Sequence, residues 1–296
     1  MAIYNFGSVN IDHVYSVEHF VQPGETLSSN TYTQLLGGKG ANQSVALAKA
    51  GATVHHVGCI NKHDTQFKQQ LIEYGVQCQY LLEGDIPSGH AIIQVTPDAE
   101  NAIVLFGGAN QKITDTLIND ALSTSSEQDW VLLQNETNAL AEIITTAKQK
   151  GLNVAFNPAP MTESVKDLPL DQIDLLIVNE VEAQMLTGES ELSDIIDYFN
   201  QKHSAQDVII TLGKKGVCML NGGNTTRVDA FNVNATDTTA AGDTFIGFFL
   251  ASYINSTASE KALVNACAAS AISVTQSGAA QSIPTQQDVE SFLQKR

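Results

Sequence analysis

The feature that most constrains the fold is a regular alternation of short apolar runs and helical segments after about residue 114. Runs rich in Val, Ile and Leu occupy residues 130–134, 153–156, 175–178 and 208–212. Helical spacing is found at residues 137–150, and two long alanine-rich segments follow at 242–254 and 260–275. Apolar runs of this length between helices are typical of parallel strands buried on both faces. The pattern predicts an α/β protein with three layers, αβα, around a mainly parallel, doubly wound central sheet.

Two early stretches depart from this rhythm. Residues 13–36 and 89–107 alternate polar and apolar side chains as strands do, and the second contains a turn signal at 97–101. We predict that they form a small β-sheet inserted into the main domain, where it would act as a lid over a site. The alternative is an edge extension of the main sheet. No internal repeat or low-complexity linker interrupts residues 1–296, so we expect a single domain.

Charge and composition exclude several classes of protein. The 296 residues carry a net charge of −17, whereas a nucleic-acid-binding protein needs a basic face. No apolar stretch approaches the roughly 18 residues of a membrane span, and the N-terminus lacks the features of a signal peptide. We therefore expect a cytoplasmic protein that binds neither nucleic acid nor membrane. The cysteines lie far apart among apolar or small residues, which predicts reduced thiols in the core; they are Cys59, Cys78, Cys218 and Cys267.

Polar or loop-forming residues follow the predicted strands four times in succession. These groups are Gln-Asn-Glu at 134–136, Asn-Pro-Ala-Pro at 157–160, Asn-Glu-Val-Glu at 179–182 and Thr-Leu-Gly at 211–213. Open α/β sheets bind their ligands outside the carboxyl ends of the strands, which meet at one edge. One such group means little, because polar residues end most strands. Four in succession predict a site along this edge.

The most informative local motif is Asp-Thr-Thr-Ala-Ala-Gly-Asp-Thr-Phe at residues 237–245, at the start of a predicted helix. Ala240, Ala241 and Gly242 are small enough for the backbone to approach a ligand, and the first N–H groups of a helix have no acceptor within it. Together with the helix dipole, these donors would form an anion hole for a phosphoryl group in transfer. Asp243, beside that hole, would accept a proton from an attacking hydroxyl. The alternative is that Asp243 only caps the helix.

A second motif, Gly-Gly-Lys-Gly-Ala-Asn at residues 37–42, precedes a helical run at 43–50. Its glycines predict a tight turn from which Lys39 and Asn42 reach into a cleft; the alternative is a glycine-rich helix entry with a solvated lysine. The chain has no G-x-x-x-x-G-K-[ST] sequence, and Gln43 stands where the last glycine of G-x-G-x-x-G would be. P-loop and dinucleotide-dehydrogenase folds are therefore disfavoured.

Together these motifs resemble the ribokinase family of carbohydrate kinases, also called the PfkB family. The resemblance extends over nearly the whole chain, at residues 7–12, 37–42, 157–160, 179–182, 211–213 and, most specifically, 237–243. It implies phosphoryl transfer from ATP to a small sugar, with Asp243 as the base for the terminal hydroxymethyl group and the backbone of residues 240–243 as the anion hole. The sugar would be held by Asn10, Asp12, Gly38, Lys39, Asn42 and Glu136.

The resemblance also implies where the nucleotide and the metal ions bind. ATP would contact Asn179, Thr211, Gly213, Gly216 and Gly242, with Ala266 and Cys267 near the adenine. Glu182 would act through water on Mg²⁺, although it could equally be an ordinary acidic residue in the first turn of a helix. A monovalent cation, usually K⁺ in this family, would be bound by oxygens of Asp237, Thr239, Ser273, Gln276, Gly278 and Ser282. Oxygen ligands suit a hard cation.

Within the family, the features at Asn10, Asp12 and Lys39 favour D-ribose, phosphorylated at its 5-hydroxyl. The alternatives are another sugar or nucleoside kinase, such as a fructokinase, a 2-keto-3-deoxygluconate kinase or a deoxyribokinase, and a sugar-binding regulator without catalysis. His90 departs from the small apolar residue common in the family. We expect it to be a surface residue of the lid; if it faced the sugar instead, the substrate could be larger or more polar. The exposed strands of the lid predict a homodimer in which two lids pair.

Overall fold

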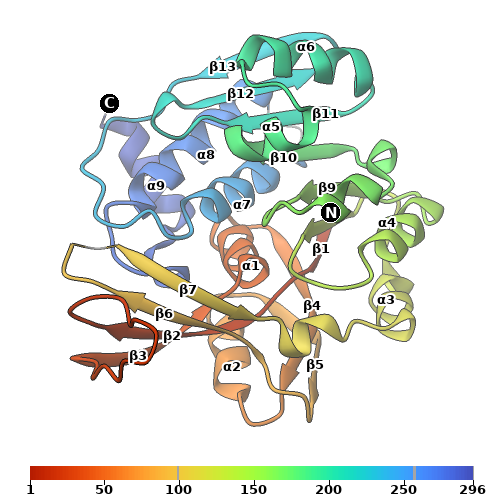
Figure 1. Ribbon diagram of the computed structural model, residues 1–296. Helices are drawn as coiled ribbons and strands as arrows, with labels where there is room; N and C mark the ends of the chain where they lie inside the picture. The colour runs from red at the N-terminus through yellow and green to blue at the C-terminus, as the bar shows by residue number, and fades with distance from the viewer. Residues whose placement is uncertain (99, 256–257, 296) are drawn as a thin grey trace.

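Nine strands form the central sheet within the part of the computed structural model that is described here, residues 1–98, 100–255 and 258–295. Their order is β13-β12-β11-β10-β9-β8-β1-β4-β5 (Figure 1). The strands are β1 Ala2–Phe6, β4 Thr53–Asn61, β5 Gln77–Gly84, β8 Trp130–Gln134, β9 Asn153–Asn157, β10 Leu175–Asn179, β11 Asp207–Thr211, β12 Val217–Asn221 and β13 Asn224–Val228. All neighbours from β11 to β5 are parallel, and β12 and β13 add an antiparallel edge. The predicted αβα architecture is confirmed.

Side chains on each face of the sheet enter different cores, because successive residues of a strand point to opposite sides. In β8, Trp130 and Leu132 belong to one core, and Val131 and Leu133 to the other. The first core is covered by α1 Lys39–Lys49, α2 Thr65–Glu73, α7 Ala241–Tyr253, α8 Ser259–Ser273 and α9 Gln286–Gln294. The second is covered by α3 Asp115–Ala121, α4 Leu140–Gln149, α5 Glu180–Thr187 and α6 Leu192–Lys202.

One helix begins later than its sequence pattern predicts. Helical spacing starts at residue 137, yet α4 begins at Leu140. Ala139, immediately before it, has a φ of 61° in the left-handed region, where a residue with a side chain does not continue a right-handed helix. The helix expected at 43–50 begins four residues early, because α1 starts at Lys39 and residues 39–42 of the predicted turn form its first turn. The C-terminal ends of the predicted strands and of the other predicted helices lie within one or two residues of their expected positions.

A second sheet has the order β3-β2-β6-β7 and is separate from the first. Its strands are β2 Asn10–Ser16, β3 Thr31–Gly37, β6 Gly89–Val95 and β7 Asn101–Phe106. The small sheet expected from residues 13–36 and 89–107 is therefore present, and it is not an edge extension of the main sheet. Residue 99, in the turn expected at 97–101, lies outside the described residues.

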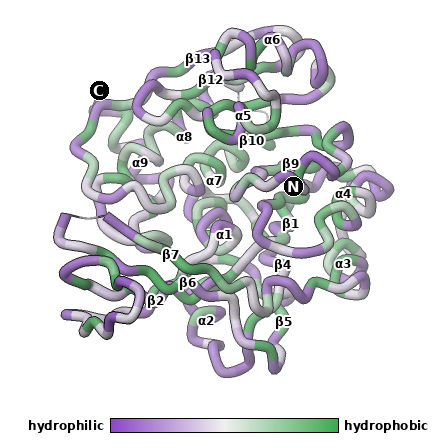
Figure 2. The backbone as a smooth tube through the Cα atoms, viewed as in Figure 1, coloured by the Kyte–Doolittle hydropathy of each residue, from purple (hydrophilic) through white to green (hydrophobic). Residues whose placement is uncertain are grey.

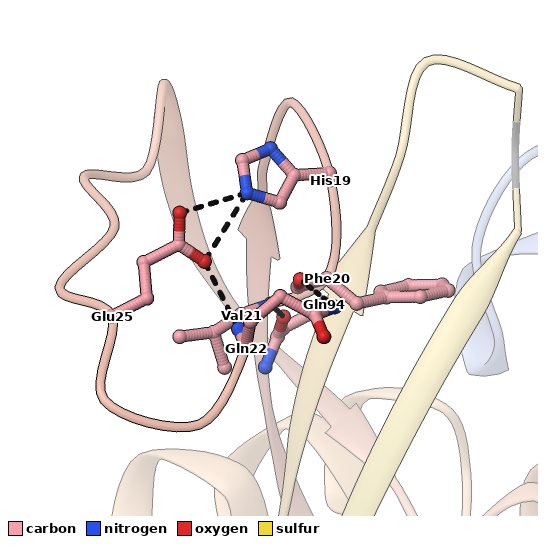
Figure 3. A network of polar contacts seen from close by, with 6 residues as sticks. All are labelled: His19, Phe20, Val21, Gln22, Glu25 and Gln94. Carbon is pink, nitrogen blue, oxygen red and sulfur yellow. Dashed lines mark hydrogen bonds and ion pairs between the residues drawn. The ribbon is translucent and has the colours of Figure 1, made fainter.

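The connection between β2 and β3 is a loop rather than continuous strand. Figure 3 shows the side chain of His19 beside Glu25, with a distance of 2.9 Å between His19 Nε2 and Glu25 Oε1. The backbone N–H of Gln22 donates to the same carboxylate at 3.0 Å, and that of Val21 donates to Gln94 Oε1 of β6 at 3.0 Å. These bonds order the loop and join it to the neighbouring strand.

Two expectations from composition can be compared with the fold. Across the described ranges, none of the helices combines the length and the hydropathy that crossing a bilayer requires. None of the four cysteines pairs with another; three are buried as expected, whereas Cys59 is partly exposed rather than in the core.

Candidate active site

The predicted polar edge of the sheet exists. Gln134 and Asn157 end β8 and β9 and are register partners, as are Asn179 and Thr211 at the ends of β10 and β11. Because these strands are parallel, their carboxyl ends lie at the same edge. The starts of α1 and α7 meet there, so the 37–42 and 237–245 motifs come together above the sheet (Figure 1).

Asp243 lies at the centre of this meeting point. Its side chain is 7% exposed, and it accepts hydrogen bonds at Oδ2 from Asn42 Nδ2 at 3.0 Å and at Oδ1 from Gln43 Nε2 at 2.9 Å. The N-cap of α7 is Ala240, and no side chain caps this helix end. The alternative of a simple helix cap is therefore wrong. Asp243 is a buried carboxylate held between two helices.

The backbone before Asp243, where the anion hole is expected, has an unusual conformation, and one of its N–H groups already has an acceptor. Ala240 has a φ of 58°, a left-handed conformation that costs roughly 1–2 kcal/mol for a residue with a side chain and is often found at functional sites. The N–H of Ala241 donates to Thr238 O at 3.3 Å, so this amide already has an acceptor. A Cβ added to Gly242 would meet nothing within 4 Å. Space for a ligand is thus left beside the first turn of the helix.

Three further charged side chains surround the same point. The negative charge of Asp243 raises the pKa of Lys39, against the opposing effect of burial. Glu136 Oε2 accepts hydrogen bonds from Ser8 Oγ and from the Lys39 backbone N–H, and burial raises the pKa of the Glu136 carboxyl. Burial raises the pKa of Asp12 to about 7, and the charge of Glu136 adds to that shift. One partly buried cation, Lys39, among several carboxylates is suited to binding a polyhydroxy ligand by charged hydrogen bonds.

The expected sugar residues Asn10 and Asp12 lie on the small sheet, on one face of β2. Asn10 Oδ1 accepts from Asn110 Nδ2 at 2.8 Å, and Asn110 Oδ1 accepts from the Val9 N–H at 2.9 Å. Asn110, which fixes the orientation of the Asn10 amide, was not predicted from the sequence. The one signal that could have indicated it is its position four residues after the end of β7 at Phe106. Position 37 requires glycine, because a Cβ there would lie 2.0 Å from Asp12 Oδ2 and would clash with that carboxylate.

His90 is on the opposite face of the small sheet. It pairs in register with Ile11, so its side chain lies on the side of Ile11 and His13 and away from Asp12. Its ring centroid is 5.7 Å from that of His13 and 5.0 Å from that of Phe106. His90 therefore does not lie on the face of Asn10 and Asp12, and it gives no reason to expect a larger sugar.

A cavity of about 450 Å³ adjoins the anion hole. Five of the residues expected to contact nucleotide line it, namely Thr211, Gly213, Gly216, Gly242 and Cys267. Neither Asn179 nor Ala266 is among the described residues on its wall; Ala266 is fully buried. The segment from Ala230 to Val233, which sequence reasoning missed, also lines the cavity. The size of the cavity and its mixture of apolar and backbone groups suit a flat heterocycle with a polar tail.

Asn179 and Glu182 form a reciprocal capping box at the start of α5. Glu182 N donates to Asn179 Oδ1 at 2.9 Å, and Asn179 N donates to Glu182 Oε2 at 3.0 Å. Burial raises the pKa of Glu182, and the charges of Lys39 and Asp243 also act on it. Glu182 therefore has the structural role of an acidic residue in the first turn of a helix, the alternative left open by the sequence. Its carboxylate is also close enough to Lys39 and Asp243 to feel their charges.

The two loops expected to bind a monovalent cation lie side by side. Asp237 accepts from the N–H groups of Thr239 and Gly278, both at 2.9 Å, and its own N–H donates to Val274 O at 3.2 Å. Ser273 Oγ and Ser282 Oγ are 3.1 Å apart. Burial raises the pKa of Asp237, but these hydrogen bonds outweigh it and leave the pKa lowered. An ionised carboxylate among carbonyl and hydroxyl oxygens is a donor set that fits a hard cation.

Comparison with known proteins now decides the family. The family model described as pfkB family carbohydrate kinase matches residues 3–286. The chain belongs to the pfkB family of carbohydrate kinases. The ribokinase of Haemophilus influenzae is 38% identical over 97% of this chain and 97% of its own length. A deoxyribokinase of Salmonella typhi is 30% identical over 99% of each chain.

Solved structures of the family agree with the fold. The structure of Arabidopsis thaliana ribokinase complexed with ribose and ATP superposes with a TM-score of 0.88 at 29% identity, covering 99% of this chain and 98% of that chain. As a member of this family, the chain is a sugar kinase.

Proposed function

We propose that this pfkB-family kinase transfers the γ-phosphoryl group of ATP to the 5-hydroxyl of D-ribose. The observation that carries the proposal is the buried Asp243 carboxylate, held by Asn42 and Gln43 at the edge of an open helix N-terminus. The relatives named ribokinase, and the A. thaliana structure with ribose and ATP, support ribose as the sugar.

The arrangement divides the reaction among three groups of residues. The sugar lies between the small sheet, with Asn10 and Asp12, and the main domain, with Lys39, Asn42 and Glu136. Asp243 accepts the proton of the attacking hydroxyl. The N–H groups at the start of α7 bind the transferring phosphoryl group, whose developing charge the helix dipole also stabilises.

ATP occupies the cavity that Thr211, Gly213 and Gly216 line, with its phosphates directed toward Gly242. Mg²⁺ bound with ATP would neutralise charge on the phosphates and would keep several of its waters. Glu182 is the carboxylate best placed to hold one of those waters. K⁺ between the 237–239 and 273–282 loops would fix the backbone that leads into the anion hole. The free cysteines and the use of ATP fit a cytoplasmic location.

The small sheet also offers a surface for a second copy of the chain. β7 is an edge strand, and four consecutive apolar residues at 103–106 are about half exposed or more, with Val104 at 67% and Leu105 at 58%. Figure 2 shows the same strand as a hydrophobic stretch of the tube. An exposed apolar edge pairs readily with another strand. A homodimer formed through this sheet would cover it.

Turnover of a panel of sugars tests the proposal. Ribose, deoxyribose, fructose and nucleosides are each supplied with ATP, Mg²⁺ and K⁺, and ADP release is measured. Ribose should give the highest kcat/KM; a higher value for deoxyribose would reassign the substrate, and binding without turnover of any compound would indicate a regulator. Asp243→Asn should lower kcat at least ~10²-fold and leave ribose binding by calorimetry intact. Near-normal turnover by this variant would remove Asp243 from its proposed role.

A further inference from the structure

A buried chain of hydrogen bonds runs from the far side of Asp243 into the protein. Gln43 of α1 is fully buried, and its Nε2 donates to Asp243 Oδ1 at 2.9 Å. Its Oε1 accepts from Gln134 Nε2, at the end of β8, at 2.8 Å. Gln134 Nε2 also donates to Asn5 Oδ1 of β1 at 2.9 Å. Three elements that are distant from α7 in sequence, namely α1, β8 and β1, are thus joined to this carboxylate.

The chain continues to a histidine. Asn5 Nδ2 donates to Ser44 Oγ at 2.8 Å, and Ser44 Oγ is 2.8 Å from His56 Nδ1. His56 Nε2 lies 3.2 Å from Gly7 O. Each of these side chains has no exposed surface, so every hydrogen bond in the chain is made inside the protein, where an unpaired polar group is costly.

Which atom donates in each hydrogen bond of the chain follows from the bond at its His56 end. A carbonyl oxygen only accepts, so His56 Nε2 carries the proton; burial lowers the pKa of His56 to about 4 and keeps the ring neutral. His56 Nδ1 must then accept from the Ser44 hydroxyl, which leaves Ser44 Oγ to accept from the Asn5 amide. Asn5 Oδ1 in turn faces Gln134, whose amide nitrogen donates to Gln43. The carboxamide of Gln43 therefore has one permitted orientation, with its NH₂ group toward Asp243.

The two oxygens of Asp243 are distinguished by this arrangement. Oδ1 faces Gln43 and the protein interior. Oδ2 faces Asn42, whose own Oδ1 is buried and meets no donor among the described residues. A hydroxyl-bearing ligand beside Asn42 would satisfy that atom and would approach Asp243 at Oδ2.

We propose that Gln43 is a positioning residue for the phosphoryl-transfer reaction, in that it holds the Asp243 carboxylate by Oδ1 and leaves Oδ2 to take the proton of the sugar hydroxyl. Gln134, Asn5, Ser44 and His56 fix the orientation of Gln43. Amide groups do not relay protons, so the chain sets geometry only. This inference rests on the proposed function, because it assigns Asp243 the role of base.

The test separates kcat from binding. Gln43→Met should lower kcat about 10- to 100-fold, the worth of one hydrogen bond to a charged group. The ribose dissociation constant and the KM for ATP should stay within about threefold, because Gln43 reaches neither ligand. Gln66→Met, an exposed site on α2, is the matched control and should leave all three values unchanged. A Gln43→Met enzyme with kcat within twofold of the wild type would overturn the proposal.

A double-mutant cycle tests the support behind Gln43. Gln134→Met should also lower kcat, since it releases Gln43, and it should add little in the Gln43→Met background. Fully additive losses in kcat would contradict the chain. If Gln43→Met does not fold, the isosteric Gln43→Glu replaces it; this variant turns an acceptor toward Asp243 and should lower kcat, whereas unchanged kcat would overturn the proposal. A wild type inactive on every sugar would instead contradict the proposed function.

Discussion

The replacement Gly247→Ala tests whether the close approach of α1 and α7 sets the geometry of the catalytic carboxylate. An ideal Cβ on Gly247 would lie 2.3 Å from Ala46 Cβ and 2.8 Å from the backbone of Ala46 and Leu47. Carbon atoms in contact are about 3.5–4.0 Å apart, so the helices must shift by roughly 1 Å or more. Overpacking of this kind costs about 1–3 kcal/mol, and the better helix propensity of alanine returns about 1 kcal/mol. The unfolding free energy should therefore fall by about 0–2 kcal/mol.

The effect on catalysis should exceed the effect on stability. Asp243 lies one helical turn before Gly247, and Gln43 lies one turn before Leu47. A shift of about 1 Å would stretch the two bonds to Asp243, now 2.9 and 3.0 Å, beyond hydrogen-bonding distance. Each bond to a charged group contributes about 1.5–3 kcal/mol, so kcat should fall at least ~10-fold.

Urea unfolding and steady-state kinetics measure both effects in the same preparation. Gly84→Ala is the control, because a Cβ there meets nothing within 4 Å, and it should change neither quantity. The double variant Ala46→Gly with Gly247→Ala removes the 2.3 Å contact and should recover part of kcat. Wild-type kcat in Gly247→Ala alone would refute the claim that this helix crossing positions Asp243.

Three further predictions concern charge, cation and assembly. Because the pKa of Asp12 is raised to about 7, its ionised form is lost as pH falls below 7, and the ribose dissociation constant should rise by up to about tenfold per pH unit; Asp12→Asn should bind weakly with a flat profile. The folded chain also retains a proton on Asp12 between about pH 4 and 7 that the unfolded chain has released, so this group makes the unfolding free energy fall as pH rises through that window, a slope that Asp12→Asn should remove in urea titrations. Replacing K⁺ by a bulky organic cation should lower kcat, and Asp237→Asn should abolish the difference; equal wild-type rates with and without K⁺ would contradict the cation site. Val104→Asp should shift sedimentation from dimer to monomer, and a wild type that sediments as a monomer at micromolar concentration would contradict the β7 interface.

Much of the fold was predictable because parallel strands buried on both faces leave continuous apolar runs in the sequence. The antiparallel edge formed by β12 and β13 was missed. Asn224–Val228 is largely polar and partly exposed and lacks such a run, whereas Val217–Asn221 has one that was overlooked. The start of α4 was placed too early because the left-handed turn at Ala139 has no glycine to indicate it.

The motifs on the polar edge were predictable from local spacing, but the contacts between them were not. Asn42 and Gln43 lie 201 and 200 residues from Asp243 in sequence, and nothing near either residue indicates the other. Gln43 was considered only as an interruption of a glycine pattern. The orientation of His90 likewise depends on how β6 pairs with β2, which the alternation of a single strand does not specify.

The short path from β1 to β2 has a mechanical consequence. β1 ends at Phe6 in the main sheet and β2 begins at Asn10 in the small sheet, so only three residues separate the two bodies. On the proposed roles, Asn10 and Asp12 grip the sugar from one body while Glu136 and Asp243 grip it from the other. The substrate would then bridge the two sheets, and the fit would depend on the length and stereochemistry of the sugar. A sugar one carbon longer would hold the small sheet further from the main domain. Selectivity would then follow from how well the length of the sugar matches that separation.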